Sequence, residues 1–502
     1  MSREQVIWIT IAVYICLIAL VAFFSSKKSK SISEFTVGGR NAGAWMSAFS
    51  YGTAYFSAVM FVGYAGGTGW RYGLWGILPG IGNALFGALV AWLVLAKRTR
   101  EYTRQHEIKS MPQLFEKRFG SSSMKLFSVA VIFVFLLPYS ASVYKGLTSI
   151  CSVLLQVDEQ ICMIIIAVAA ALIVVTGGYI ATLKADFIQG FIMIVGVILL
   201  ILSVFRAEQV GGFSEGLKAL SERTAELNLT SQSLIGLWAI VLMTSFGTWG
   251  LPQMVHKYYG IKDDKQVRRG TIISTVFALI VAGGGYFIGS MSVLFFNQSE
   301  VDVFPAPSTD YIVPNMLSQA GLSNILLGLV LVLLIAASVS TLASITISAS
   351  STVTMDLIQD RFIKKKEFNI APLTKVFCLV FVVLSYVIAN SNTPILQMMS
   401  YSWGILSGSF LAPYLISLYS KKITRAAAWT GMLGGFITAT PPLIASLMGS
   451  SVEIGSFGEL KNLGPHFACL AMLVSLILCL AVTYIKPQKS TEPEKQKELA
   501  TV

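Results

Sequence analysis

The sequence predicts an all-α membrane protein that crosses the bilayer many times. The chain has 502 residues, of which 55% are hydrophobic and only 12% are charged, and its mean hydropathy is +0.71. A soluble domain carries roughly 25% charged residues. Apolar runs long enough for a hydrocarbon core of about 30 Å recur along the whole chain. The predicted fold class is therefore a polytopic α-helical protein with about 13 transmembrane helices.

Hydropathy and loop charge together place the individual spans. The first run, VIWITIAVYICLIALVAFF, is too long for the apolar core of a signal peptide, so we expect a retained span. The expected cores are 5–25, 45–66, 75–96, 124–154, 160–177, 187–206, 233–256, 271–296, 324–354, 371–390, 395–419, 426–447 and 464–485. Together they form one transmembrane domain over residues 1–490, followed by a charged tail, 487–502, that we expect to be disordered in the cytoplasm.

The net charge of +12 orients the protein rather than binding nucleic acid. Basic residues gather in alternate short loops, which is the positive-inside pattern. The main groups are Lys27, Lys28, Lys30 and Arg40; Lys97, Arg98, Arg100 and Arg104; Lys265, Arg268 and Arg269; Lys364, Lys365 and Lys366; and Lys421, Lys422 and Arg425. With an odd number of spans, the N-terminus is predicted outside and the C-terminus in the cytoplasm. The expected location is a cell membrane, such as a bacterial inner membrane.

Cysteine and histidine usage argues against an enzyme or a metal centre. The six cysteines lie singly in or beside apolar runs, and none has metal-ligand spacing. The three histidines are far apart and share no motif. We therefore expect no catalytic residue and no cofactor.

Two of the spans look interrupted rather than simple. The second contains Gly52 and Gly63 around a small, polar centre, and the seventh contains Gly247, Gly250 and Pro252. Broken helices at matching places in two halves are typical of transporters built from inverted repeats. We therefore expect a first five-helix repeat over 45–206 and a second over 233–419, with 5–25, 426–447 and 464–485 as flanking helices.

A hydroxyl-rich face runs through the ninth span, LLIAASVSTLASITISASSTVTMDL. Residues 337, 340 and 341 share one helix face, so the Ala337 carbonyl and the Ser340 and Thr341 hydroxyls point toward one region. Neutral oxygens of this kind suit a hard cation such as sodium. Close helix packing, which also uses small and hydroxylated residues, is the competing interpretation.

Several ordered motifs resemble those of the sodium/solute symporter family, which includes sodium–proline, sodium–pantothenate and sodium–glucose carriers. They are VGGRNAG, GGYIATLKADFIQG, FGTWGLPQ, AASVSTLAS and SYSWGILSGSFLAP, in that order. The pattern is most similar to the pantothenate- or monocarboxylate-type bacterial branch. The resemblance implies a LeuT-type fold of two inverted five-helix repeats. It also implies a sodium site formed by the backbone carbonyls of Thr53, Phe56 and Ala337 and the hydroxyls of Ser340 and Thr341.

The resemblance further implies that Asp186 lies on the cytoplasmic exit path of the sodium ion. The alternative from the sequence is an interfacial carboxylate that pairs with Lys184. Ser57 is expected to contact substrate or ion, with helix packing as the competing account. None of the proposed ligands is a buried acid, which argues against proton coupling.

Residues at two positions separate this chain from proline carriers. Those carriers have an acidic residue at Tyr55 and a tryptophan at Thr244, so the pattern favours a small solute that bears a carboxylate. Tyr139 and Trp249 complete the expected substrate-binding set. Lys145 either meets that carboxylate or extends toward the outer surface.

The predicted function is sodium-coupled symport of a small carboxylate, vitamin or amino acid into the cell by alternating access. Its partners are then Na⁺, the solute and the lipid bilayer, while the oligomeric state stays open. A proton-coupled carrier and a non-transporting membrane sensor are the alternatives. A monoanion that travels with one sodium ion gains nothing from the membrane potential, so an anionic solute would favour two sodium ions. The sequence identifies only one sodium site.

Overall fold

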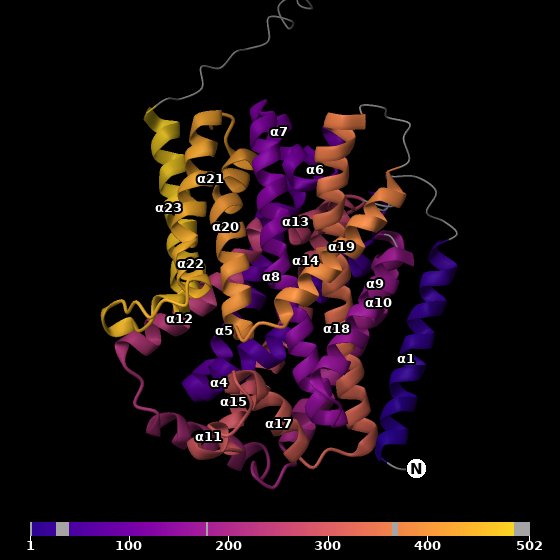
Figure 1. Cartoon of the computed structure of the whole chain (residues 1–502), viewed down its shortest axis with the longest axis vertical. Coiled ribbons are helices and arrows are strands. Elements are labelled where there is room, and N and C mark those ends of the chain that lie inside the picture. Colours follow the sequence, from indigo (N-terminus) through magenta and orange to yellow (C-terminus); the bar gives the residue numbers. More distant parts are fainter. Residues whose placement is uncertain (1–2, 27–39, 177–178, 364–369, 486–502) are drawn as a thin grey trace, which may run out of the picture.

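The computed structural model describes residues 3–26, 40–176, 179–363 and 370–485, which fold into helices joined by loops (Figure 1). The predicted tail, the loop lysines at 27–30 and 364–366, and parts of the first two motifs lie outside the described residues.

The elements of the first half run from α1 to α10. They are α1 (Arg3–Ser26), α3 (Ala44–Tyr55), η2 (Met60–Gly66), α4 (Gly67–Tyr72), η3 (Gly73–Ile77), α5 (Leu78–Gly82), η4 (Asn83–Val90), η5 (Trp92–Ala96), α6 (Lys97–Gln105), α7 (Met111–Phe119), α8 (Ser122–Leu155), α9 (Glu159–Thr176) and α10 (Tyr179–Val204).

The second half runs from α11 to α23. Its elements are α11 (Phe213–Glu226), α12 (Ser231–Phe246), η6 (Gly247–Gly250), α13 (Pro252–Tyr259), α14 (Asp264–Ala278), η7 (Leu279–Gly283), α15 (Gly284–Ser290), η8 (Met291–Leu294), α16 (Gln298–Val301), η9 (Ser308–Tyr311), α17 (Ile312–Gln319), α18 (Asn324–Ser351), η10 (Thr352–Ile363), α19 (Ala371–Ala389), α20 (Ile395–Tyr419), α21 (Arg425–Ala439), α22 (Pro441–Leu447), η11 (Gly455–Phe457), η12 (Leu460–Asn462) and α23 (Gly464–Ile485).

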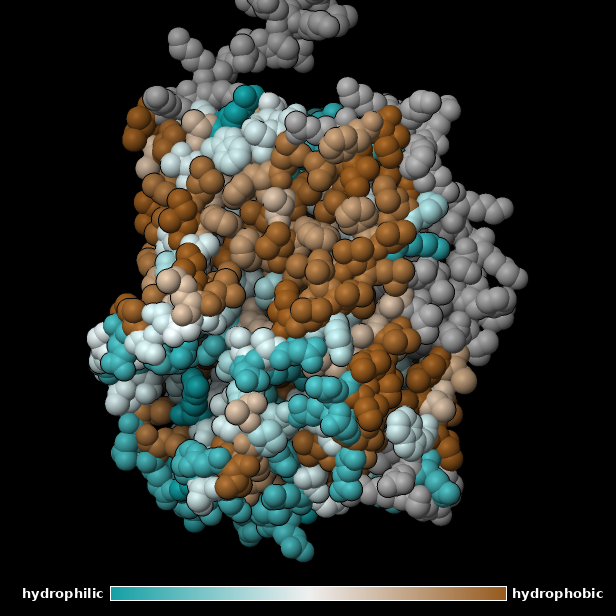
Figure 2. Space-filling view, in the orientation of Figure 1, coloured by the Kyte–Doolittle hydropathy of each residue, from teal (hydrophilic) through white to brown (hydrophobic). Residues whose placement is uncertain are grey.

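The helices form a bundle with the surface of a membrane protein. Within the described residues, 8 helices are long and apolar enough to cross a membrane, and two shorter apolar helices accompany them. Figure 2 shows a broad hydrophobic band with hydrophilic residues gathered at one end of the molecule. The start of α1 and the end of α23 lie at opposite ends of the bundle (Figure 1). The count of 13 spans and the side that faces the cytoplasm stay predictions.

Both expected helix breaks are present. The second span stops at the end of α3, where Phe56 has an extended backbone (φ −107°, ψ 117°), and it resumes in η2. The seventh span stops at Leu251 (φ −80°, ψ 122°), between η6 and α13. The twelfth expected span is also split, at Thr440, because Pro441 and Pro442 follow and proline ends a helix.

The first break lies in the middle of the bundle because α3 is packed closely on three sides. α3 contacts α10, α14 and α18, and α18 also contacts α1, α8 and α10. A Cβ atom at Gly52 would lie 2.4 Å from the ring of Phe277, and one at Gly190 would lie 2.2 Å from the ring of Phe49. Small residues therefore hold the broken helix against its neighbours, as expected for helices in a membrane.

Candidate functional site

The break after α3 releases backbone groups that α18 then engages. Thr341 Oγ1 lies 3.0 Å from the Thr53 carbonyl oxygen. A second bridge runs from the Ala58 backbone N–H to Ser338 Oγ, at 3.2 Å. An interrupted helix is tolerated in a bilayer only where protein groups satisfy its free backbone. Here the hydroxyls of α18 supply those partners.

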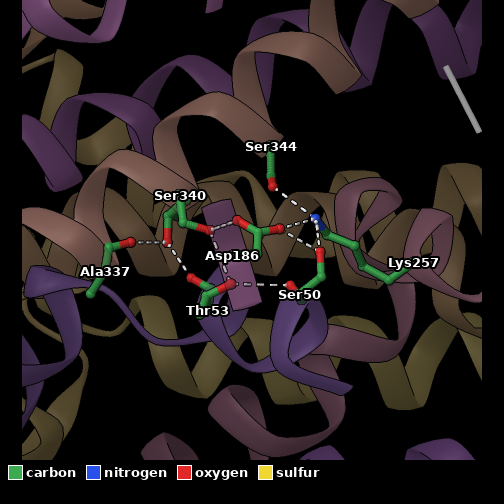
Figure 3. Close-up of polar contacts among 8 residues, drawn as sticks. Ser50, Thr53, Asp186, Lys257, Ala337, Ser340 and Ser344 are labelled. Carbon is green, nitrogen blue, oxygen red and sulfur yellow. Dashed lines mark hydrogen bonds and ion pairs between the residues drawn. The ribbon is translucent and has the colours of Figure 1, made fainter. Parts of the chain in front are cut away.

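Oxygen atoms of Thr53, Ala337 and Ser340 gather at this break (Figure 3), and Thr341 adds its hydroxyl to them. Thr341 is the residue that contacts both carbonyls. Its Oγ1 lies 3.0 Å from both the Thr53 and the Ala337 carbonyl oxygens. Ser340 Oγ lies 3.0 Å from Thr53 Oγ1. These residues are buried, at 0–2% exposure. The Thr341 hydroxyl has one proton to share between two carbonyls, so the cluster offers more oxygen acceptors than protons.

The structure thus brings four of the five predicted sodium ligands together. They are Thr53 from α3 and Ala337, Ser340 and Thr341 from α18. Phe56, the fifth, lies at the break itself, and its ring stacks on Tyr55 with centroids 4.2 Å apart. Its carbonyl is assigned to the site by the family resemblance alone. A set of neutral carbonyl and hydroxyl oxygens is the donor chemistry of a hard monovalent cation.

Asp186 of α10 adjoins this cluster. Ser340 Oγ lies 2.5 Å from Asp186 Oδ1, and Ser50 Oγ donates to the other carboxylate oxygen. Lys257 Nζ lies 3.4 Å from Asp186 Oδ2. The ion pair of Asp186 within the described residues is therefore with Lys257, not with the alternative partner Lys184. Asp186 is fully buried and belongs to the edge of the cluster rather than to an interface.

Lys257 is the residue of this site that the sequence reasoning missed. The expected seventh span ended at residue 256, which left Lys257 outside the membrane region. In the structure the span continues past the break into α13, and the Lys257 side chain is only 4% exposed. The sequence did contain one signal: Lys257 follows Pro252, where the broken helix resumes, by five residues.

A small central pocket lies next to the break. Of the predicted substrate-binding residues, Tyr55, Ser57 and Thr244 line it. Tyr55 Oη donates a 2.5 Å hydrogen bond to the Thr244 carbonyl oxygen. The remaining lining residues are Phe56, Val59, Met60, Tyr64, Asn83, Tyr286, Met399 and Trp403. The pocket has a volume of about 10 Å³, so it is nearly closed in this structure. None of the lining side chains carries a formal charge, and the lining offers hydroxyl, amide and aromatic groups.

The other predicted substrate residues lie outside this lining. Tyr139 packs edge-on against Trp403, with ring centroids 5.5 Å apart, and so supports the pocket wall from behind. Trp249 Nε1 donates a 3.0 Å hydrogen bond to the Phe86 carbonyl oxygen. Lys145 Nζ donates to carbonyl oxygens of Ser391 and Thr393, both at 2.8 Å. Lys145 is therefore engaged by a loop rather than by the pocket.

Two further cavities lie on either side of the site and differ in size. One, of about 260 Å³, is lined by residues that include Gly63, Gly67, Arg71, Leu396 and Gln397. A 3.4 Å contact from Tyr64 Oη to the Leu396 carbonyl oxygen separates it from the central pocket. The other, of about 30 Å³, lies toward Lys109 and Ser110 and is lined in part by Lys257, Ser344 and Ser348. The larger cavity, here called the vestibule, lies on the face opposite the basic residues of α6.

Comparison with known sequences decides the family. A model of the sodium:solute symporter family matches residues 35–435. The chain belongs to this family. A sodium/proline symporter of Staphylococcus aureus is 25% identical over 496 residues, which cover 97% of this symporter and 93% of that protein. The osmoregulated proline transporter OpuE of Bacillus subtilis is 26% identical over 451 residues, which cover 87% and 88% of the two chains.

Solved structures of transporters share the fold. A Na⁺-coupled sialic acid symporter in a substrate-bound outward-open state gives a TM-score of 0.74 at 16% identity and covers 96% of this symporter and 99% of that chain. MHP1, a nucleobase-cation-symport-1 family transporter in a closed conformation, gives 0.57 at 12% identity and covers 92% and 97%. At these identities the likeness shows the fold alone, and that fold is the LeuT type expected from the motifs. The symporter is a multi-pass membrane transporter and not an enzyme.

Proposed function

We propose that the protein couples the entry of sodium to the uptake of a small organic solute across the cell membrane. The observation that carries the proposal is the oxygen cluster at the helix break, where the Thr53 and Ala337 carbonyls meet the Ser340 and Thr341 hydroxyls. A sodium ion bound in this cluster would be coordinated directly by these oxygens, in place of the hydrogen bonds that the hydroxyl groups now make. It would also tie the broken helix α3 to α18.

Coupling follows from the position of the cluster between the two cavities. Sodium bound between α3 and α18 favours the arrangement in which the vestibule is open and the central pocket is formed. Solute then binds against Tyr55 and Thr244, the Tyr64–Leu396 contact encloses it, and the cavity near Lys109 widens to release both. Each ligand shifts the equilibrium only by its difference in affinity for the two arrangements.

The pocket chemistry favours a compact solute with a carboxylate, such as a monocarboxylate or an amino acid. Phe56 and Ser57 line the pocket and also flank the helix break, so a carboxylate that enters the pocket meets the sodium ion as its counter-charge. Tyr55 and Tyr286 add aromatic surface to the lining. The two relatives from Staphylococcus aureus and Bacillus subtilis are named as proline transporters, and proline is one member of this chemical class.

Proton coupling is the second candidate, and one observation favours it. The sequence argument against it was that no buried acid stands among the ligands, yet Asp186 contacts the ligand Ser340 directly. The Lys257 ammonium already neutralises that carboxylate in the structure, which leaves sodium as the favoured coupling ion. An uptake assay with separate sodium and proton gradients distinguishes the two.

The test is uptake by purified protein in proteoliposomes with an inward sodium gradient and a pool of carboxylates, amino acids, pantothenate and sugars, read by mass spectrometry. We expect one solute to accumulate and its accumulation to vanish when potassium replaces sodium. The pair Ser340→Ala and Thr341→Ala should lose sodium dependence, because two of the ligand hydroxyls are gone. Accumulation driven equally by a proton gradient alone would contradict the proposal.

A matched control lies on the same helix. Thr346 is buried on α18, and its hydroxyl has no hydrogen-bond partner within the described part of the chain. Thr346→Ala therefore removes a buried hydroxyl from α18 without touching the cluster, and sodium dependence should persist. Equal loss in the control and in the Ser340→Ala, Thr341→Ala pair would show that the effect comes from helix packing.

A further inference from the structure

A second set of oxygens lies one helical turn away from the sodium cluster. On α3, Ser50 precedes Thr53 by three residues, and on α18, Ser344 follows Thr341 by three residues. Residues at this spacing lie on the same helix face. The two helices that form the first cluster therefore present a further pair of hydroxyls side by side (Figure 3).

The Lys257 ammonium occupies the space between these hydroxyls. Its Nζ lies 2.9 Å from Ser50 Oγ and 3.0 Å from Ser344 Oγ. Asp186 Oδ2 lies 3.4 Å from the same nitrogen. Both charged side chains are buried, at 4% and 1% exposure. Two hydroxyls and a carboxylate would suit a bare monovalent cation as well as they suit an ammonium group.

Asp186 connects the two clusters through its two oxygens. Oδ1 contacts Ser340 of the first cluster, while Oδ2 contacts Ser50 and Lys257 of the second. A buried carboxylate without a counter-charge is costly, so some cation must accompany Asp186 through the transport cycle. In this protein the ammonium group of Lys257 supplies that cation, and it is part of the chain itself.

We propose that Lys257 is a tethered cation that fills a second cation position, so that only the position at Thr53, Ala337, Ser340 and Thr341 exchanges sodium. This inference rests on the proposed function and fixes its stoichiometry at one sodium ion per solute. It also accounts for the single sodium site that the sequence showed, because the chain supplies its own charge at the second position. With one sodium ion, the membrane potential drives uptake only of a solute without net charge, so the inference favours a zwitterionic amino acid over a monocarboxylate.

The tethered charge also sets how the exchangeable sodium is held. Because Lys257 neutralises Asp186, the neighbouring sodium position keeps neutral oxygen ligands and no net negative charge. Sodium can then leave into the cavity lined by Ser344 and Ser348 without separating from an unpaired carboxylate. Removing the ammonium leaves the Asp186 charge free to attract sodium, which should tighten sodium binding roughly tenfold or more.

The test is equilibrium binding of ²²Na⁺ to purified protein, together with the ratio of ²²Na⁺ to solute taken up by proteoliposomes. The wild type and Lys257→Arg should bind one sodium ion with a Hill coefficient near one. Lys257→Met, which keeps most of the length of the side chain but not the charge, should bind a second sodium ion. The double variant Lys257→Met, Asp186→Asn should return to one.

Three outcomes would overturn the inference. They are two sodium ions in the wild type, a folded Lys257→Met that binds sodium as the wild type does, and a double variant that still binds two. A merely structural ion pair predicts lower thermal stability in Lys257→Met with no change in sodium number. If Lys257→Met does not fold, Lys257→Gln takes its place: its amide can still donate hydrogen bonds to nearby oxygens but carries no charge, so it too should bind a second sodium ion.

Failure of this inference is distinguishable from failure of the proposed function. A wild type that binds no sodium, or whose binding survives Ser340→Ala with Thr341→Ala, contradicts the sodium site itself. The wild type could instead bind two sodium ions, one of which is lost in the Ser340→Ala, Thr341→Ala pair. That result would support the sodium-coupled function and contradict only the tethered cation.

Discussion

Gly87 of η4 supports the wall of the central pocket, and a single methyl group added there should weaken solute binding. A Cβ atom at residue 87 would lie 2.2 Å from Tyr55 Oη and 2.9 Å from two atoms of its ring. Ordinary contact starts near 3.4 Å, so the hydroxyl must move by about 1.2 Å (3.4 less 2.2). The 2.5 Å hydrogen bond from Tyr55 to the Thr244 carbonyl cannot keep its geometry unless Thr244 moves too.

The magnitude follows from these contacts. Overpacking of a close site costs about 1–3 kcal/mol, and losing one hydrogen bond costs about 1 kcal/mol. Together these costs come to about 2–4 kcal/mol, so if the strain is relieved by reshaping the pocket, the affinity for solute falls about 30- to 700-fold. The affinity for sodium should stay unchanged, because residue 87 does not contact Thr53, Ser340 or Thr341.

The assay is sodium-driven uptake by Gly87→Ala, with the KM for solute and the KM for sodium measured separately. Gly67→Ala is the control, because its new Cβ would have nothing within 4 Å. Adding Tyr55→Phe to Gly87→Ala removes the atom nearest the new methyl group and should restore part of the affinity. A folded Gly87→Ala with an unchanged KM for solute would refute this account of the pocket wall.

Two further predictions concern stability. Burial raises the pKa of Asp310, in the short helix η9 near Lys145, to about 7, so the folded state holds a proton there that the unfolded chain has lost. Stability should therefore fall as pH rises from about 4 to about 7, and Asp310→Asn should flatten that slope in a thermal-shift assay. The second prediction concerns Gly435, where a Cβ atom would lie 1.8 Å from the Gly408 carbonyl oxygen. Gly435→Ala should therefore force α20 and α21 apart and lower Tm by several degrees. Gly67→Ala, whose new Cβ would have nothing within 4 Å, should leave Tm unchanged. Equal pH slopes in the wild type and Asp310→Asn, or equal Tm values in the two glycine variants, would contradict these predictions.

The sequence predicted those parts of the site that depend on a local pattern. Ala337, Ser340 and Thr341 lie on one helix face by spacing alone, and the glycines around residues 52 and 63 indicated the break that exposes Thr53. The family motifs supplied the pairing of these segments, which spacing could not give.

What the sequence did not show depends on how distant helices pack. The partner of Asp186 is Lys257, 71 positions away, whereas the only partner that the local sequence offered was Lys184. Tyr139 and Trp249 are aromatic residues in suitable spans, yet neither is among the residues that line the central pocket: Tyr139 packs on Trp403, and Trp249 donates a hydrogen bond to the Phe86 carbonyl. Which face a side chain presents to a pocket is set by crossing helices, and hydropathy carries no such information.

The unequal cavities also determine where the membrane voltage acts. In the proposed orientation, water that fills the vestibule of about 260 Å³ would carry the outer solution down to the Tyr64–Leu396 contact, whereas the opposite cavity of about 30 Å³ has room for little water. An electric field concentrates across the part of a membrane protein that water does not reach. The full potential, about 2.3 kcal/mol per charge at 100 mV, would then fall between that contact and the opposite face of the membrane. A sodium ion that moves from Tyr64 to the cluster at Thr341 would cross part of that voltage, so binding itself, and not only the later rearrangement, would respond to voltage.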